Sequence, residues 1–199
     1  MATRIPADIL EWAKKEYLEG PSSELYLNIG FYLGWFAAAE TSVTAALANV
    51  LGYRNWDRFE LVVRGMDPRV KCERLRHACD IYKKMGPNLD GCLEHFERKC
   101  IPLRNIVAHS WPLFIPEERR AKFLGFGRMA TPDADMPANR IAHMDDIFSQ
   151  AMWLNLFAGT LIDSLTDEPD TSILEITSTN PYLLSVIRQK ASSQGSTRH

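Results

Sequence analysis

Apolar residues recur at spacings of three and four over most of the chain, which is the pattern of helices that pack one face against a core. The longest such stretch, 23–51, contains no proline and ends before Gly52, so it predicts one long helix that is apolar on nearly all sides. A helix of this kind lies either at the centre of its domain or against a partner subunit. Within it, Gly30 and Gly34 would let another helix approach closely, and tight packing inside one bundle is favoured over a dimer seam.

Shorter amphipathic stretches predict further helices at 6–18, 57–65 and 67–85. In the last of these, Asp67 is a suitable cap and Pro68 a suitable first residue. Its remaining surface carries a strip of basic residues: Lys71, Arg74, Arg76, Lys83 and Lys84. A solvated face is favoured over an RNA-contacting one.

Another helix is predicted over about 88–109. Its apolar stripe consists of Leu93, Phe96, Cys100, Leu103 and Val107. Pro102 within it lacks an N–H and would clash with the carbonyl of Arg98, so we expect a kink there. The helix should end shortly before Pro112, because a residue that precedes proline avoids the α region.

The rest of the chain begins with 111–116, which leaves the bundle. Two short alternating stretches, 122–129 and 139–144, predict a β-hairpin joined by the loop 131–138. A strongly apolar stretch, 144–166, then predicts the closing helix.

Together these elements predict an all-α fold, an up-and-down helical bundle with a small β-hairpin inserted before the last core helix, because short connections favour antiparallel neighbours. The bundle spans 23–166, and residues 1–22 carry a helix as an amino-terminal appendage. Residues 167–199 are a carboxy-terminal extension, with one weak helix within 170–190 and a polar tail at 191–199.

Composition and charge favour a soluble cytoplasmic protein. No apolar stretch is long enough to span a membrane, because Glu40 interrupts the longest candidate. The four cysteines form no C-x-x-C pair and follow no secretory leader, so reduced thiols are expected. The formal net charge of −2 gives no overall attraction to a polyanion, so any binding of nucleic acid must be local.

Polar residues at the end of the predicted 88–109 helix are the candidate chemistry of the chain. Arg104, Asn105 and His109 lie within the run R-N-I-V-A-H. Asn105 and His109 are one helical turn apart, so they project from the same side. An imidazole in the last turn lies against the negative end of the helix dipole, which favours its protonated form.

This run, at the end of a late helix in a helical chain, resembles the R-x4-6-H signature of the HEPN superfamily. The resemblance covers roughly 23–166, and only 104–109 is specific. It implies a helical bundle with the Arg and His late in the third core helix, and a homodimer with a composite, metal-independent ribonuclease site at its interface. Some members of the superfamily are non-catalytic modules.

Arg104 and His109 are five residues apart, which in a helix is a turn of about 140° and a rise of about 7.5 Å, so one helix alone is a poor active site. Two copies facing each other across a twofold axis would surround one phosphate with two such pairs. His109 could remove the 2′-hydroxyl proton or protonate the departing 5′ oxygen, while Arg104 stabilises the added negative charge. Asn105 could orient His109 or bind a phosphate oxygen. The expected products are 2′,3′-cyclic phosphate and 5′-hydroxyl ends.

Glu40 and Ser110 are candidate supporting residues. A carboxylate in the apolar middle of a long helix is costly unless it is paired, so Glu40 should meet Arg104, His109 or another base. Pairing with a purely structural arginine fits the pattern equally well.

No cofactor and no metal are expected. Asp145 and Asp146 are better explained as charges in the first turn of a helix than as metal ligands. The histidines lack ligand-like spacing with the cysteines, and structural roles are favoured for His77, His95 and His143.

The sequence therefore favours a metal-independent endoribonuclease of the toxin or defence kind that acts on RNA as a homodimer, with an antitoxin protein as a candidate partner by resemblance alone. The alternative is a non-catalytic module that binds a nucleotide, an RNA or a protein. A plain structural bundle would be favoured if Arg104 were buried in a salt bridge away from any cleft.

Overall fold

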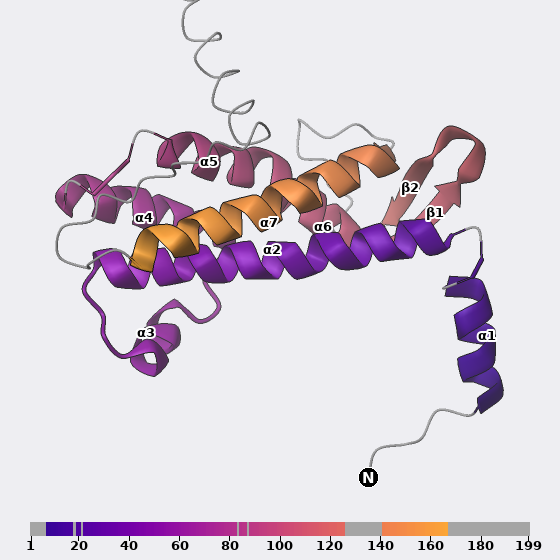
Figure 1. Ribbon diagram of the computed structural model, residues 1–199, viewed down its shortest axis with the longest axis horizontal. Coiled ribbons are helices and arrows are strands. Elements are labelled where there is room, and N and C mark those ends of the chain that lie inside the picture. Colours follow the sequence, from indigo (N-terminus) through magenta and orange to yellow (C-terminus); the bar gives the residue numbers. More distant parts are fainter. Residues whose placement is uncertain are drawn as a thin grey trace, which may run out of the picture.

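Helices make up most of the described chain, and a small sheet lies at one end of them (Figure 1). The computed structural model describes residues 7–17, 19–20, 22–82, 84–86, 88–125 and 141–166. The helices, in order, are α1 (Ala7–Tyr17), α2 (Ser23–Val50), α3 (Trp56–Val63), α4 (Pro68–Tyr82), α5 (Leu89–His95), the π-helical turn η1 (Phe96–Cys100), α6 (Ile101–His109) and α7 (Met144–Thr166). The strands are β1 (Ser110–Ile115), β2 (Arg120–Gly125) and β3 (Ile141–His143), with the 3₁₀ turn η2 (Pro116–Glu118) between the first two.

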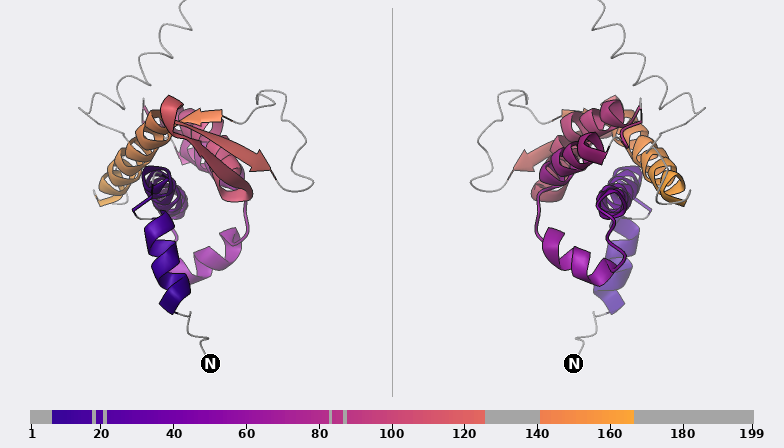
Figure 2. Two further views of the ribbon diagram at one scale, coloured as in Figure 1. Left: turned by 90° about the vertical axis from the view of Figure 1, so that its right-hand side faces the viewer. Right: turned by 90° about the vertical axis from the view of Figure 1, so that its left-hand side faces the viewer.

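The long helix predicted at 23–51 is α2, and it is the centre of the fold. α7 lies along it (Figure 1), and α1, α3, α4 and α6 also contact it. The end-on views of Figure 2 show the other helices arranged around α2. Its buried side presents large side chains such as Tyr32, Phe36 and Leu47, each at most 3% exposed. Burial of a large apolar side chain contributes about 1.5–3 kcal/mol, so this helix carries much of the core.

The glycines of α2 lie on its other side. Gly30 and Gly34 are exposed, and a Cβ built on either would meet no atom within 4 Å among the described residues. The prediction that they allow tight packing inside one bundle is therefore wrong for this part of the chain. Their neighbours Leu27 and Phe31 are also exposed, so this face of α2 is apolar and open.

The helix that carries the motif is continuous from α5 through η1 to α6. Pro102 is the second residue of α6, where a regular α-helix would press its ring against the carbonyl of Arg98. Instead, the turn before it is widened, and the N–H of Ile101 donates to the carbonyl of Phe96. The disturbance predicted at Pro102 is thus a π-helical turn on its amino-terminal side. The helix ends at His109, as predicted.

A three-stranded antiparallel sheet, in the order β1-β2-β3, follows the motif helix. The predicted hairpin is present as β2 and β3, in which Lys122 pairs with Ile141. β1, which was not predicted, pairs with β2 along its whole length. β1 is an edge strand, where Pro112, a residue without an N–H, is tolerated. The fold is mostly helical, as predicted, with one strand more than expected.

The basic strip predicted on α4 is only partly a solvated face. Lys71 donates to the Glu40 carboxylate at 2.6 Å. Arg76 holds Glu97 through two hydrogen bonds of 2.9 and 2.7 Å and Asp90 through a third of 2.8 Å. These cations fasten α4 to α2 and to the segment that carries the motif.

The ends of the chain are described in part. α1, in the segment predicted as an appendage, projects from the amino-terminal end of α2 (Figure 1). The predicted loop 131–138 and the extension 167–199 lie outside the described residues. None of the described helices is both long enough and apolar enough to cross a membrane.

Candidate functional site

The structure holds the side chain of Arg104 against α2. Its guanidinium carbon lies 5.7 Å from the centroid of the Phe36 ring, within the range of a cation–π contact. One guanidinium nitrogen, Nη1, donates to Oδ1 of Asn105 at 3.1 Å. Arg104 is half-buried, and no salt bridge joins it to a carboxylate of the described residues. The buried salt bridge that would have favoured a plain structural bundle is therefore absent from the described residues.

His109 is the last residue of α6 and is exposed. No hydrogen bond or ion pair joins its imidazole to any residue that the structure describes. Asn105, one turn earlier, is also exposed, so the two side chains lie on an open surface of the helix. Ser110 is half-buried and begins β1. The imidazole is therefore free to meet a ligand.

Glu40 is paired with a base, but not with either member of the motif. Its carboxylate accepts from Nζ of Lys71 at 2.6 Å, and the two side chains are 27% and 11% exposed. The pair joins α2 to α4. Lys71 is the base that the Glu40 carboxylate was expected to need.

Beside the motif, the sheet presents an apolar surface that the sequence analysis did not identify. Trp111, two residues after His109, is 55% exposed, and Leu113 on the same face of β1 is half exposed. Leu124 of β2 is the register partner of Trp111 and is exposed as well. The alternation of apolar residues after His109 would have predicted this face if β1 had been recognised.

Phe36 is the other contributor that the sequence could not identify. It lies on the buried side of α2, and nothing in its local pattern distinguishes it from other core aromatics. Its ring also stacks on Phe96, with centroids 5.1 Å apart, so the residue that contacts Arg104 is itself fixed by the core.

His95 and the four cysteines have structural surroundings. His95 contacts Oε1 of Gln150 through Nε2 at 2.9 Å and packs on Trp153; burial lowers its pKa. All four cysteines are free and buried, and burial raises the pKa of Cys72 and of Cys92 to about 12. Such thiols are poor nucleophiles at neutral pH. Within the described ranges, no group of three or more His, Cys, Asp or Glu could hold a metal ion.

No protein-family model, curated protein or solved structure matches this chain. The resemblance of 104–109 to the HEPN signature therefore stands on the motif and on the order of the helices. Function has to be argued from the site itself.

Proposed function

We propose that this chain is a HEPN-like, up-and-down helical bundle that works as a metal-independent endoribonuclease of the toxin or defence kind. The proposal rests on the surroundings of Arg104 and His109. Arg104 is held by Phe36 and Asn105, while the imidazole of His109 is exposed and has no partner among the described residues. Phosphodiester cleavage requires a cation that binds the phosphate and an acid–base group that is free to move a proton, and the motif supplies one of each.

In this mechanism His109 removes the proton from the 2′-hydroxyl of the RNA. The resulting oxygen attacks the adjacent phosphorus, the bond from phosphorus to the 5′ oxygen breaks, and the departing oxygen takes a proton from a second histidine. Arg104 binds the phosphate and stabilises the negative charge that builds up on its oxygens. Asn105 holds the guanidinium or contacts a phosphate oxygen. The products carry 2′,3′-cyclic phosphate and 5′-hydroxyl ends.

The second histidine comes from a second copy of the chain. Arg104 turns toward α2 and His109 ends α6, so one helix presents a single acid–base group. A twofold axis beside the exposed face of α6, which carries Asn105, Ala108 and His109, would bring two copies of the motif to one phosphate.

Trp111 favours RNA as the substrate. Its exposed ring follows His109 by two residues and offers a surface on which an unstacked base can lie. Stacking would position the nucleotide whose phosphate is cut, without a requirement for one base.

The second candidate function is a non-catalytic module that binds a protein partner. The exposed apolar face formed by Trp111, Leu113 and Leu124 favours it, because contiguous apolar surface marks interaction sites.

Cleavage of a mixed RNA in EDTA separates the two. We expect wild type to cut and to leave cyclic phosphate ends, and His109→Ala to cut about 10²–10⁴-fold more slowly, the usual contribution of general acid–base catalysis. Arg104→Gln should be impaired similarly. His77→Ala removes another exposed histidine, on α4, and is the matched control.

Folding and oligomeric state are measured on each variant by circular dichroism and light scattering. Equal activity of wild type and His109→Ala would disprove the assigned role of His109. An intact dimer that leaves RNA uncut would favour the binding module.

A further inference from the structure

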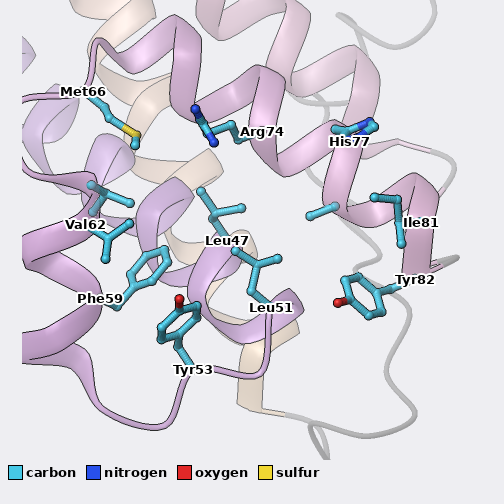
Figure 3. A pocket seen from close by; sticks show the side chains of 12 residues that line it. Leu47, Leu51, Tyr53, Phe59, Val62, Met66, Arg74, His77, Ile81 and Tyr82 are labelled. Carbon is cyan, nitrogen blue, oxygen red and sulfur yellow. The ribbon is translucent and has the colours of Figure 1, made fainter.

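A cavity of about 230 Å³ lies between α3, α4 and the carboxy-terminal end of α2 (Figure 3). Leu47, Phe59, Val63 and Ala78 line it and are buried. Leu47 lies eleven residues beyond Phe36 on α2, which is about 16 Å along the helix axis, so the cavity is separate from the motif.

The rim of this cavity is apolar and open to water. Tyr53, Val62, Ile81 and Tyr82 all line it, and each is about half exposed or more. Figure 3 shows Phe59 and the rim side chains around one common space. Apolar surface of this kind is stabilised when a ligand removes it from water, at about 25 cal/mol for each Å².

Two basic side chains stand beside this apolar space, and none of the described residues that line it is acidic. Arg74 and His77 both come from α4, three residues apart, so they lie on one face of that helix. Figure 3 shows Arg74 on the Met66 side of the cavity and His77 on the Ile81 side. Neither has a hydrogen-bond or ion-pair partner within the described part of the chain. By contrast, Lys71 and Arg76 of the same helix are both paired with carboxylates of neighbouring elements.

The size of the cavity limits the occupant. A cavity of about 150 Å³ accepts benzene, and sites for drug-sized ligands start at about 300 Å³. A volume of about 230 Å³ therefore suits a ligand of about ten non-hydrogen atoms.

We propose that this cavity binds a small apolar carboxylate, with its hydrocarbon part between α2 and α3 and its carboxylate at Arg74 and His77. The guanidinium matches a carboxylate through two parallel N–H donors. The apolar lining disfavours a fully polar anion. A neutral hydrocarbon would leave Arg74 and His77 without a partner, so it should bind less tightly than a carboxylate.

Calorimetric titration of the full chain with sodium octanoate tests this, with 1-octanol as a probe that has the same number of carbon atoms and no charge. Octanoate is expected to bind saturably with a Kd below about 1 mM, and octanol at least about 10-fold more weakly. The double variant Arg74→Gln with His77→Gln should weaken octanoate binding about 10-fold or more while leaving octanol binding unchanged.

Two single variants complete the experiment. Arg69→Gln removes another exposed arginine of α4 that does not line the cavity, and it should bind octanoate as wild type does. Val62→Trp fills the rim from an exposed position, so the fold is retained while binding of both probes is lost. Absence of saturable octanoate binding to wild type, equal affinity for octanol, or unchanged binding by the double variant would each overturn the proposal.

Discussion

The hydroxyl of Tyr32 donates a 2.6 Å hydrogen bond to the carbonyl oxygen of Cys100, across the contact between α2 and η1. Tyr32 is fully buried, and burial raises its pKa, so the hydroxyl stays a neutral donor. α2 thereby fixes the backbone at the proline-widened turn from which Arg104 projects.

Tyr32→Phe is therefore expected to lower the free energy of unfolding by about 0.5–1.5 kcal/mol, because it removes the buried hydrogen bond to the Cys100 carbonyl. Urea unfolding measures this. Tyr53→Phe, at a half-exposed tyrosine, is the control and should change stability by less than about 0.5 kcal/mol. Equal stability of Tyr32→Phe and wild type would show that the hydroxyl does not support the turn.

The relation between Tyr32 and Cys100 also shows where prediction from sequence stops. Helical periodicity and stop signals located α2 and the end of the motif helix at His109 to within a residue, because both depend on neighbours in the sequence. The partner of Tyr32 lies 68 residues further along the chain, and no local sequence pattern indicates a contact over that separation. For the same reason the need of Glu40 for a base was predictable, whereas the choice of Lys71 depended on how α4 docks.

The pair formed by Glu40 and Lys71 should be structural. A double-mutant cycle with Glu40→Gln and Lys71→Met is expected to give a coupling energy of about 1–2 kcal/mol, above that of an exposed pair because both groups are largely buried. RNA cleavage by folded Glu40→Gln should stay within about twofold of wild type, since the carboxylate is engaged away from the motif. A loss of cleavage of about 100-fold with the fold intact would instead place Glu40 in the active site.

Stability should fall on acidification because of His95. Burial lowers its pKa in the folded state, and the contact with Gln150 offsets this only in part. The unfolded chain therefore binds the proton more readily, and this contribution to stability is present above a pH of about 6.5 and lost below it, with a slope of at most about 1.4 kcal/mol per pH unit.

Urea unfolding of wild type and of His95→Gln between pH 5 and pH 8 checks this expectation. The variant should be less stable at pH 8, because it loses the packing on Trp153, and should depend less on pH below about 6.5. His77→Gln, at an exposed histidine, should keep the wild-type slope. Parallel curves for wild type and His95→Gln would assign the acid sensitivity to other groups.

Trp111 should contribute to binding of RNA and not to the chemical step. Trp111→Ala is expected to raise KM about 10-fold with kcat nearly unchanged, because stacking on one base contributes about 1–3 kcal/mol. Trp111→Phe keeps an aromatic ring and should recover most of the affinity. Leu113→Ala, on the same exposed face, should have little effect; if it weakens binding of RNA as strongly as Trp111→Ala does, apolar contact explains the effect and stacking does not.

The proposed composite site requires that two copies meet at α6, and two exposed helix faces compete for that role. Ala108→Arg places a charge between Asn105 and His109 on α6, and should give a folded monomer that no longer cuts RNA. Gly34→Arg places the same charge on the open apolar face of α2, where a Cβ meets no described atom within 4 Å, and should leave both the dimer and cleavage unchanged. Gly159→Arg, at an equally open glycine of α7, controls for the added charge.

Light scattering and RNA cleavage are measured on the three variants. If Gly34→Arg alone yields monomers, the dimer forms through α2. The motifs of two copies then do not face each other, and the composite mechanism fails.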